Sequence, residues 1–334
     1  MNILITGGVG FIGSHLAERL LERGNRVCIV DDLSTGSLKN IQHLQENPNF
    51  SLVLGSILDE SLMERLVDES EEIYHLAAAV GVKYIMEHPL RSIHVNVHGT
   101  EIVLKLASKS KKKVMVASSS EVYGKDGNFP YKEDGTRLMG ATSILRWSYA
   151  CTKALDEFLA LAYWREKKLP VVIMRFFNTC GPKQTGQYGM VIPRFVSNAL
   201  SGKPLVVYGD GNQSRCFTYV GDVIRGIIAL MACPKAVGEV FNIGSTQEIQ
   251  IKELAQKVIQ LTGNNSKIEY MSYEDAYGKG FEDMKRRVPD ISKIYKFIGW
   301  QPSVEIDELL GKVIEYYRTE GKRENVTERE GKKT

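Results

Sequence analysis

The first half of the chain alternates short apolar runs with longer segments whose apolar residues recur at helical spacing. The apolar runs are NILIT (2–6), RVCIV (26–30), FSLVL (50–54), EIYHL (72–76), KVMVA (113–117) and LPVVIMRF (169–176). Their lengths and β-branched residues are typical of strands, and the segments between them are typical of amphipathic helices. This alternation predicts an α/β fold built on a doubly wound parallel sheet.

The pattern changes after residue 178, where Gly, Pro and Gln become frequent and strand-like runs become few. We expect residues 1–178 and 219–245 to form the first domain, with VFNIG (240–244) as a seventh strand. We expect 179–218 and 246–318 to form a smaller, mixed α/β substrate domain, and 319–334 a charged tail. The tail has no apolar anchors, so we expect it to fray.

Three glycines follow the first predicted strand and precede a helical pattern. Gly7 permits a tight turn, Gly10 removes a Cβ where a backbone approaches a pyrophosphate, and Gly13 lets the helix pack closely on the strand. The start of that helix offers free N–H groups to phosphates. This arrangement is typical of the nucleotide cradle of a Rossmann-type domain, although an ordinary glycine-rich turn has the same spacing.

The second strand ends in Asp31 and Asp32, about 20 residues after the glycines, where a carboxylate binds the ribose hydroxyls of a dinucleotide. The alternative is a surface carboxylate at a strand end. A carboxylate would repel a 2′-phosphate, so the sequence favours NAD over NADP as the cofactor.

A Tyr-x-x-x-Lys motif lies in a predicted helix over 147–164. Tyr149 and Lys153 are four residues apart and therefore share one face of that helix. A free tyrosine, with a pKa of about 10, is a poor base at neutral pH, and a nearby ammonium favours the phenolate. The pair predicts a tyrosine base that acts on an alcohol; the alternative is a core tyrosine beside a solvated lysine.

Hydroxyl groups follow the strand at 113–117, at the sheet edge where chemistry occurs in open parallel sheets. Ser118, Ser119 and Ser120 stand there, followed by Glu121. A serine at this place can bind the substrate alcohol beside the tyrosine, or it can simply cap the next helix.

Together these motifs resemble the extended short-chain dehydrogenase/reductase family, and within it the nucleotide-sugar epimerases, dehydratases and decarboxylases. The resemblance covers roughly residues 1–315. It implies that the cofactor is bound by Gly7, Gly10, Phe11, Ile12, Gly13, Asp31, Asp32, Ser56, Ile57, Leu76, Ala77, Ala78, Asn96, Lys153 and Phe176. It implies that a UDP-sugar is bound by Val82, Ser119, Ser120, Tyr149, Asn178, Val191, Arg194, Val206, Tyr208, Gln213, Arg215 and Arg287.

The resemblance also implies a role for each catalytic group. Ser119 holds O4 of the sugar, Tyr149 takes its proton while C4 gives a hydride to NAD⁺, and Lys153 holds the nicotinamide ribose. Arg215 and Arg287 match positions that grip the diphosphate, for which the guanidinium fork is suited. Each arginine has an alternative interpretation as a surface ion pair, and Arg286 is the alternative ligand to Arg287.

Residues near Glu121 bear on the reaction. Dehydratases carry Asp-Glu after their Ser or Thr, whereas this chain has Ser120-Glu121, so dehydration is disfavoured. UDP-hexuronate decarboxylases carry a similar Ser-Glu pair, and the stretch 146–149 resembles one decarboxylase branch. The stretch 178–191 looks more like bacterial and archaeal 4-epimerases.

We therefore predict an NAD-dependent 4-epimerase of a UDP-hexose or UDP-hexuronate that works through a 4-keto intermediate. The alternative is a UDP-glucuronate decarboxylase that uses Glu121 and forms UDP-xylose or the 4-keto-pentose. Glu121 can also be only a buried partner of a backbone N–H or of Arg146. A non-catalytic NAD-binding scaffold is the remote alternative, because such proteins usually lose the tyrosine or the lysine.

Composition narrows the class of protein. The net charge of +3, without an aromatic-laced basic patch, argues against nucleic acid as a partner. No apolar run approaches the length of a membrane span. Five scattered cysteines and a strand that starts at once favour a cytoplasmic protein. The histidines lack further ligands, so we predict no metal. Surplus apolar residues on the helices at 89–109 and 147–164 predict, by similarity, a homodimer through a four-helix bundle.

Overall fold

The computed structural model describes residues 1–187, 189–278 and 282–331, and it describes side chains up to residue 320. At its centre is a parallel sheet of seven strands in the order β11-β6-β5-β4-β1-β2-β3. The strands are β1 (Asn2–Thr6), β2 (Arg26–Asp31), β3 (Phe50–Leu54), β4 (Glu72–His75), β5 (Lys113–Ser119), β6 (Val171–Phe176) and β11 (Glu239–Ile243). The predicted Rossmann-type parallel sheet is therefore confirmed.

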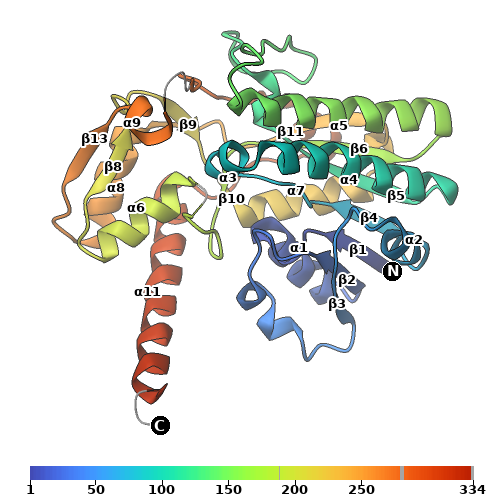
Figure 1. Ribbon diagram of the computed structural model, residues 1–334, viewed down its shortest axis with the longest axis horizontal. Coiled ribbons are helices and arrows are strands. Elements are labelled where there is room, and N and C mark those ends of the chain that lie inside the picture. Colours follow the sequence, from blue (N-terminus) through green and yellow to red (C-terminus); the bar gives the residue numbers. More distant parts are fainter. Residues whose placement is uncertain (188, 279–281, 332–334) are drawn as a thin grey trace.

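Helices cover both faces of this sheet (Figure 1), which explains why the central strands are apolar on both sides. One face carries α1 (Phe11–Glu22), α7 (Val220–Ala232) and α10 (Ser292–Ile298). The other carries α2 (Glu60–Asp68), α4 (Pro89–Lys109) and α5 (Arg146–Lys167). Leu16 and Ile227 belong to the first core cluster, and Val103 and Ala160 to the second; all four are fully buried.

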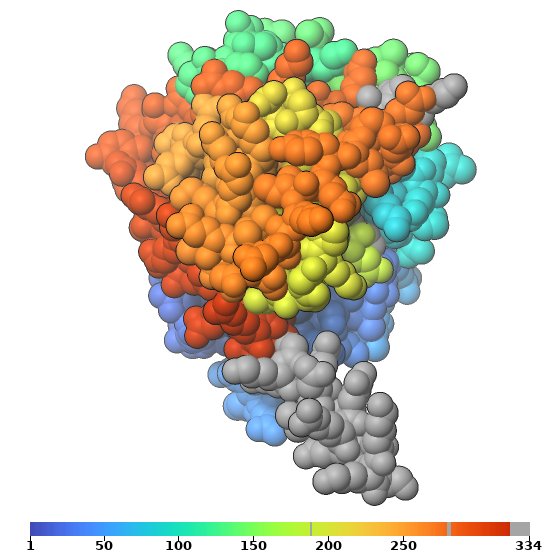
Figure 2. Space-filling model, turned by 90° about the vertical axis from the view of Figure 1, so that its left-hand side faces the viewer, coloured from blue at the N-terminus to red at the C-terminus, as the bar shows by residue number. Residues whose placement is uncertain are grey.

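A smaller lobe, at the left of Figure 1, has a core of its own. It contains a parallel pair of strands, β8 (Leu205–Tyr208) and β13 (Ile268–Met271), and four helices. The helices are α6 (Val191–Leu200), α8 (Ile251–Thr262), α9 (Tyr273–Tyr277) and α11 (Ile306–Gly331). Figure 2 shows residues from about 200 to 310 gathered on one face of the molecule, in front of the N-terminal part.

Short elements connect the central sheet to the smaller lobe or lie next to the ends of the strands. They are α3 (Val82–Glu87), β7 (Thr179–Cys180), β9 (Ser214–Cys216), β10 (Thr218–Tyr219), β12 (Glu248–Gln250) and the 3₁₀ turns η1 (Leu38–Asn40), η2 (Gln42–Leu44), η3 (Ser120–Tyr123) and η4 (Pro234–Ala236). Among the described residues, no helix combines the length and apolarity that crossing a bilayer would need.

Two segments differ from the expectation. Helix α6 lies inside the insertion at 179–218, and α11 continues to Gly331 through much of the stretch expected to fray; residues 332–334 lie outside the described part. Helix α10 lies within the predicted substrate domain by sequence, yet its Ile294 packs into the first core cluster. The division into two domains stays a prediction.

Candidate active site

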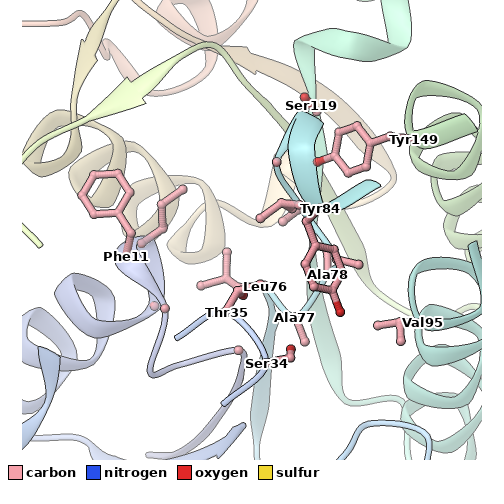
Figure 3. Close-up of a pocket in the computed structure, with 18 of the residues that line it drawn as sticks. Phe11, Ser34, Thr35, Leu76, Ala77, Ala78, Tyr84, Val95, Ser119 and Tyr149 are labelled. Carbon is pink, nitrogen blue, oxygen red and sulfur yellow. The ribbon is translucent and has the colours of Figure 1, made fainter. Parts of the chain in front are cut away.

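A cavity of about 450 Å³ opens at the carboxyl ends of the central strands (Figure 3). Its wall takes in residues from β2, β5 and β6, from the loops after β1, β2, β3, β4 and β6, and from helices α1, α3, α4 and α5, of which α3 is Val82–Glu87. It brings together nearly all the predicted cofactor residues, namely Gly7, Gly10, Phe11, Ile12, Gly13, Asp31, Asp32, Ser56, Ile57, Leu76, Ala77, Ala78, Lys153 and Phe176. Residues up to 169 positions apart, Gly7 and Phe176, thus meet in one place.

The glycine turn leaves no room for side chains. Gly7 has φ +70°, and a Cβ there would stand 2.7 Å from the backbone of Ala77. A Cβ on Gly13 would stand 2.5 Å from the carbonyl oxygen of Gly7. At the start of α1, the backbone of the glycine turn is therefore in close contact with the backbone of Ala77 and of α1 itself. Phe11, on the cavity wall, lies next to this contact. This is the geometry that a dinucleotide pyrophosphate requires.

Carboxylates stand at the end of β2, as expected. Both oxygens of Asp31 accept backbone hydrogen bonds, from Val9 at 3.0 Å and from Leu33 at 2.9 Å. Burial raises the pKa of Asp31, and these hydrogen bonds oppose that shift. Asp32 pairs with Arg91 at 3.3 Å. The acidic character of this end fits ribose hydroxyls and opposes a 2′-phosphate. Ser34 and Thr35, which sequence reasoning missed, also line it (Figure 3).

Asn96, predicted to bind the cofactor, does not lie on the cavity wall. It is buried on α4, where its Oδ1 accepts from the Ala79 backbone at 2.8 Å. Its amide also donates to Thr152 of α5 at 3.3 Å. Because Ala79 does line the cavity, Asn96 ties the loop after β4 to the helix that carries Tyr149.

The predicted catalytic groups converge. Tyr149 of α5 projects into the cavity toward Ser119 at the end of β5, opposite Phe11 (Figure 3). Ser119 also accepts from the Glu121 backbone N–H at 3.2 Å, so it caps η3 as well as facing the cavity. Lys153 is buried one turn beyond Tyr149.

The pKa of Tyr149 is not simply lowered by Lys153, as the Tyr-x-x-x-Lys motif alone would predict. Burial raises the pKa of Tyr149, and the Lys153 cation acts against that increase. A hydrogen bond with Ser119 also lowers this pKa, whereas the carboxylates of Glu121 and Asp156 raise it further. Without a bound cofactor, the net direction is upward.

Glu121 lies between two arginines from distant parts of the chain. Its Oε2 accepts from Arg146 at 2.9 Å and its Oε1 accepts from Arg287 at 2.8 Å. Burial would raise the pKa of Glu121, but the two cations and their hydrogen bonds hold it at about 2. Arg287 also donates to Ser120 at 3.2 Å. Glu121 is therefore an ionised carboxylate that orders a cationic wall of the cavity.

Arg146 continues to a second carboxylate. It donates to Asp283 at 2.7 Å, and Asp283 in turn accepts from Arg215 at 2.9 Å. Sequence reasoning named Arg146 only as a partner for Glu121 and did not place it at the cavity. Arg286, the alternative to Arg287, is half-exposed and pairs with Glu248 instead.

The predicted substrate residues divide into two groups. Those that line the cavity are Val82, Ser119, Ser120, Tyr149, Asn178 and Arg287. Those outside the cavity lining are Val191, Arg194, Val206, Tyr208, Gln213 and Arg215. Most of the second group contact one another: Arg194 lies 4.1 Å from the Tyr208 ring centre and donates to the Val206 carbonyl, and Gln213 donates to the Tyr208 carbonyl.

The sequence and the fold are similar to those of known proteins. The model of the GDP-mannose 4,6 dehydratase family matches residues 4–313. A UDP-N-acetyl-alpha-D-glucosaminuronate decarboxylase of Bacillus cytotoxicus is 47% identical over 316 residues, which cover 94% of this chain and 97% of that protein. UDP-glucuronic acid decarboxylase 1 of Xenopus tropicalis is 36% identical over 320 residues, which cover 95% and 72%.

A solved structure that shares the fold contains two ligands. UDP-glucuronic acid 4-epimerase from Bacillus cereus, in complex with UDP-glucuronic acid and NAD, has a TM-score of 0.86 and 29% identity, covering 96% of this chain and 99% of that one. The predicted cofactor, NAD, is confirmed by this likeness and by the NAD-bound members of the same family.

The prediction of a 4-epimerase was wrong. The relatives that are 47% and 36% identical over nearly the whole chain carry the names of decarboxylases, which are lyases, whereas the epimerase named above is 29% identical. The prediction gave more weight to the stretch 178–191 than to Ser120-Glu121. In the structure, Ser120 and Glu121 bond to Arg287 on the same cavity wall as Tyr149.

Proposed function

The chain belongs to the GDP-mannose 4,6-dehydratase family, within the extended short-chain dehydrogenases/reductases, and on that premise we propose that it is an NAD-dependent decarboxylase of a UDP-hexuronate. One observation carries the proposal: Glu121 holds Arg146 and Arg287 at the cavity beside Tyr149. Two buried guanidinium groups suit a substrate that brings its own carboxylate, which a neutral hexose lacks.

UDP-N-acetylglucosaminuronate is the first candidate substrate. The Bacillus cytotoxicus relative named for that substrate matches nearly the full length of both chains at 47% identity. UDP-glucuronate is the second candidate, supported by a relative at 36% identity. The two differ at C2 of the sugar, so a comparison of the two substrates separates them.

The oxidation uses the groups at the end of β5 and on α5. Bound NAD supplies a hydride acceptor for C4 of the sugar and, once reduced, a hydride donor. The chain's own part is acid–base chemistry: Ser119 holds O4, and Tyr149 takes the O4 proton as C4 becomes a ketone. Lys153 would hold the nicotinamide ribose. The glycine turn, Asp31 and Asp32 hold the rest of the dinucleotide.

Decarboxylation then follows from the position of the ketone. With C4 oxidised, the C6 carboxylate is that of a β-keto acid. The C5–C6 bond breaks, CO₂ leaves, and the electron pair forms an enolate whose charge rests on O4, beside Tyr149 and Ser119. C5 takes a proton from water. Arg287 and Arg146 bind the carboxylate before it leaves, and Glu121 keeps them oriented.

We place the nucleotide toward the smaller lobe. Asn178 stands on the cavity wall, and Arg215 lies just beyond it, held by Asp283. Arg215 would bind the diphosphate, and the base would lie near Val206, Tyr208 and Arg194. Support comes from the mutual contacts of these residues and from the UDP-sugar in the solved relative.

A homodimer through α4 and α5 completes the proposal. These helices lie side by side over one face of the sheet (Figure 1). Their outer surface exposes large apolar side chains: Leu90 is 85% exposed, Ile93 40%, Leu155 45% and Phe158 64%. The corresponding surface of a second copy would bury them and form a four-helix bundle.

All five cysteines are free thiols, and two of them, Cys180 and Cys216, are buried. Free, scattered thiols are typical of proteins in reducing compartments. We therefore infer a cytoplasmic location. Detection of the chain in fractionated cells tests this directly.

Replacing Glu121 by Gln tests the proposed reaction. The amide keeps the shape but no longer holds two guanidinium groups, so CO₂ release should fall by roughly 100-fold or more. Oxidation at C4 should persist, and reduced cofactor should accumulate. The matched control is Glu248→Gln, which breaks the ion pair with Arg286, outside the cavity lining. Release of CO₂ at the unaltered rate by the Glu121 variant would contradict the proposal.

A further inference from the structure

The catalytic helix carries a second charged side chain that the reaction, as described, does not use. Lys153 Nζ donates to Asp156 Oδ2 at 2.9 Å, and the two side chains are 3% and 0% exposed. Removing two charges from water costs several kcal/mol per ion, so a buried pair is a weak source of stability. Its presence directly behind the catalytic tyrosine calls for a reason other than stability.

The neighbouring carboxylate, Glu157, makes four hydrogen bonds with other parts of the chain. Glu157 accepts from both ends of the Arg175 guanidinium at 2.8 Å, from Arg137 at 2.5 Å and from Ser118 at 2.6 Å. It thus ties α5 to β5 and β6. Asp156 has its charged partner, Lys153, on its own helix. Burial raises the pKa of Asp156, whereas the Lys153 cation and a hydrogen bond with Thr100 of α4 lower it.

Tyr149, Lys153 and Asp156 share one face of α5, at positions i, i+4 and i+7. The charged groups around Tyr149 from other elements are Glu121 of η3 and its partner Arg287; Arg146 lies at the start of α5 itself. From β4 comes His75, which is fully buried between Thr6 and Thr100, with a pKa lowered by burial to about 3, so it is neutral.

We propose that Asp156 is a positioning residue that holds the Lys153 ammonium and balances its charge, so that Tyr149 can act as a base in the oxidation and as an acid in the later reduction of the 4-keto group. This inference rests on the proposed function and extends it: the product is the UDP-pentose rather than the 4-keto-pentose.

The two proton transfers of Tyr149 explain why the charge of Lys153 should be balanced by that of Asp156. In the oxidation, the O4–H bond breaks and Tyr149 takes the proton; in the reduction, C4 regains a hydride and O4 regains the proton from Tyr149. A lysine without a counter-charge would hold Tyr149 as the phenolate and hinder the second step. Because Lys153 and Asp156 together carry no net charge, the protonation of Tyr149 follows the charge that the cofactor brings.

A spectroscopic titration tests the proposal without turnover. Tyrosinate absorbance is followed against pH in the NAD-loaded protein, and the curve of a Tyr149→Phe variant is subtracted to isolate Tyr149. Asp156→Asn should move the midpoint to lower pH by on the order of one unit, given a separation of two helical turns. A midpoint that stays in place or moves to higher pH overturns the proposal.

Three further variants serve as controls for this titration. Asp156→Glu keeps the charge and should restore the midpoint. Asp156→Leu removes the charge with an apolar side chain of similar size, and it gives the same prediction if the Asn variant does not fold. Asp307→Asn, which breaks an exposed pair with Lys257, should leave the midpoint unchanged.

Product analysis adds a readout that a merely structural role would not move. With a UDP-hexuronate, the Asp156→Asn holoenzyme should release up to about tenfold more 4-keto-pentose relative to pentose, because a Tyr149 of lower pKa is more often the phenolate, which has no proton to return to O4. An unchanged ratio counts against the proposal. If the unaltered protein releases no CO₂, the proposed function fails, whereas the titration still decides the role of Asp156.

Discussion

At the residue scale, the motifs that depend on short spacing could be predicted, and the ion pairs could not. Tyr149 and Lys153 are four apart, so helical geometry alone brings them together. The environment of Glu121 depends on Arg146 and Arg287, which are 25 and 166 positions away. No periodicity reports such a pairing, and this is why the sequence left the role of Glu121 open between a reacting group and a buried partner.

The buried state of Glu121 predicts a dependence of stability on acid. Its pKa in the folded protein is about 2, below the ordinary value of 4.5, because the charges of Arg146 and Arg287 outweigh the effect of burial. Its contribution is therefore present above the ordinary pKa and is lost as pH falls from 4.5 toward 2. The free energy of unfolding should drop across this window by up to about 3 kcal/mol on account of this group.

Chemical unfolding at a series of pH values, compared with the same series for Glu121→Gln, isolates the contribution. The variant should show a shallower drop between pH 4.5 and 2. A residual slope is expected, in part from Glu18: burial raises its pKa, but hydrogen bonds with His15 and Lys183 lower it to about 2. Parallel curves for the two proteins would contradict the assignment.

At the element scale, the sequence predicted the seven central strands but missed structure in the smaller lobe. Buried parallel strands are continuous apolar runs, which are easy to recognise. Helix α6 lies in a stretch rich in Gly and Gln, and its signal is the apolar spacing of Ile192, Phe195, Val196 and Ala199, all fully buried. Short strands such as β9 and β12 depend on pairing with each other and have no pattern of their own.

The close contact of β1, its turn and α1 predicts the effect of a methyl group at Gly13. A Cβ would meet the Gly7 carbonyl oxygen at 2.5 Å and Gly8 Cα at 2.6 Å, and both are backbone atoms. Gly13→Ala should therefore lower the free energy of unfolding by about 1–3 kcal/mol and weaken NAD binding.

Gly311→Ala is the matched control, because a Cβ there meets no atom within 4 Å and the position is inside α11. It should stabilise the protein by about 0.5–1 kcal/mol. Thermal unfolding with and without NAD measures both effects. Equal changes in the free energy of unfolding and in NAD binding for the two variants would show that the turn tolerates a side chain.

At the scale of the whole molecule, the fold and the cofactor followed from the sequence and the reaction did not. The stretch 178–191, on which the epimerase prediction rested, contributes seven residues to the cavity wall, from Asn178 to Met190. Epimerases and decarboxylases of UDP-sugars share a fold and a nucleotide, so that stretch does not distinguish them. The distinguishing groups are those expected to meet C6, and they come from three separate segments.

The proposed dimer also belongs to this scale. Phe158 on α5 is 64% exposed, and a glutamate there would replace a large apolar contact of the bundle by a charge that loses its water. Sedimentation at micromolar concentration should show a dimer for the unaltered protein and a monomer for Phe158→Glu. Leu261→Glu, at a 40% exposed position on α8, should leave the dimer intact. A monomer mass for the unaltered protein would refute the proposal.

The most direct test of the central claim is an NMR time course of the purified protein with UDP-N-acetylglucosaminuronate and UDP-glucuronate, each labelled with ¹³C at C6. We predict that the label leaves as CO₂ and that a UDP-pentose appears, faster from the N-acetylated substrate. A galacto-configured product that keeps all six sugar carbons, with no label lost, would contradict the assignment of this chain as a decarboxylase.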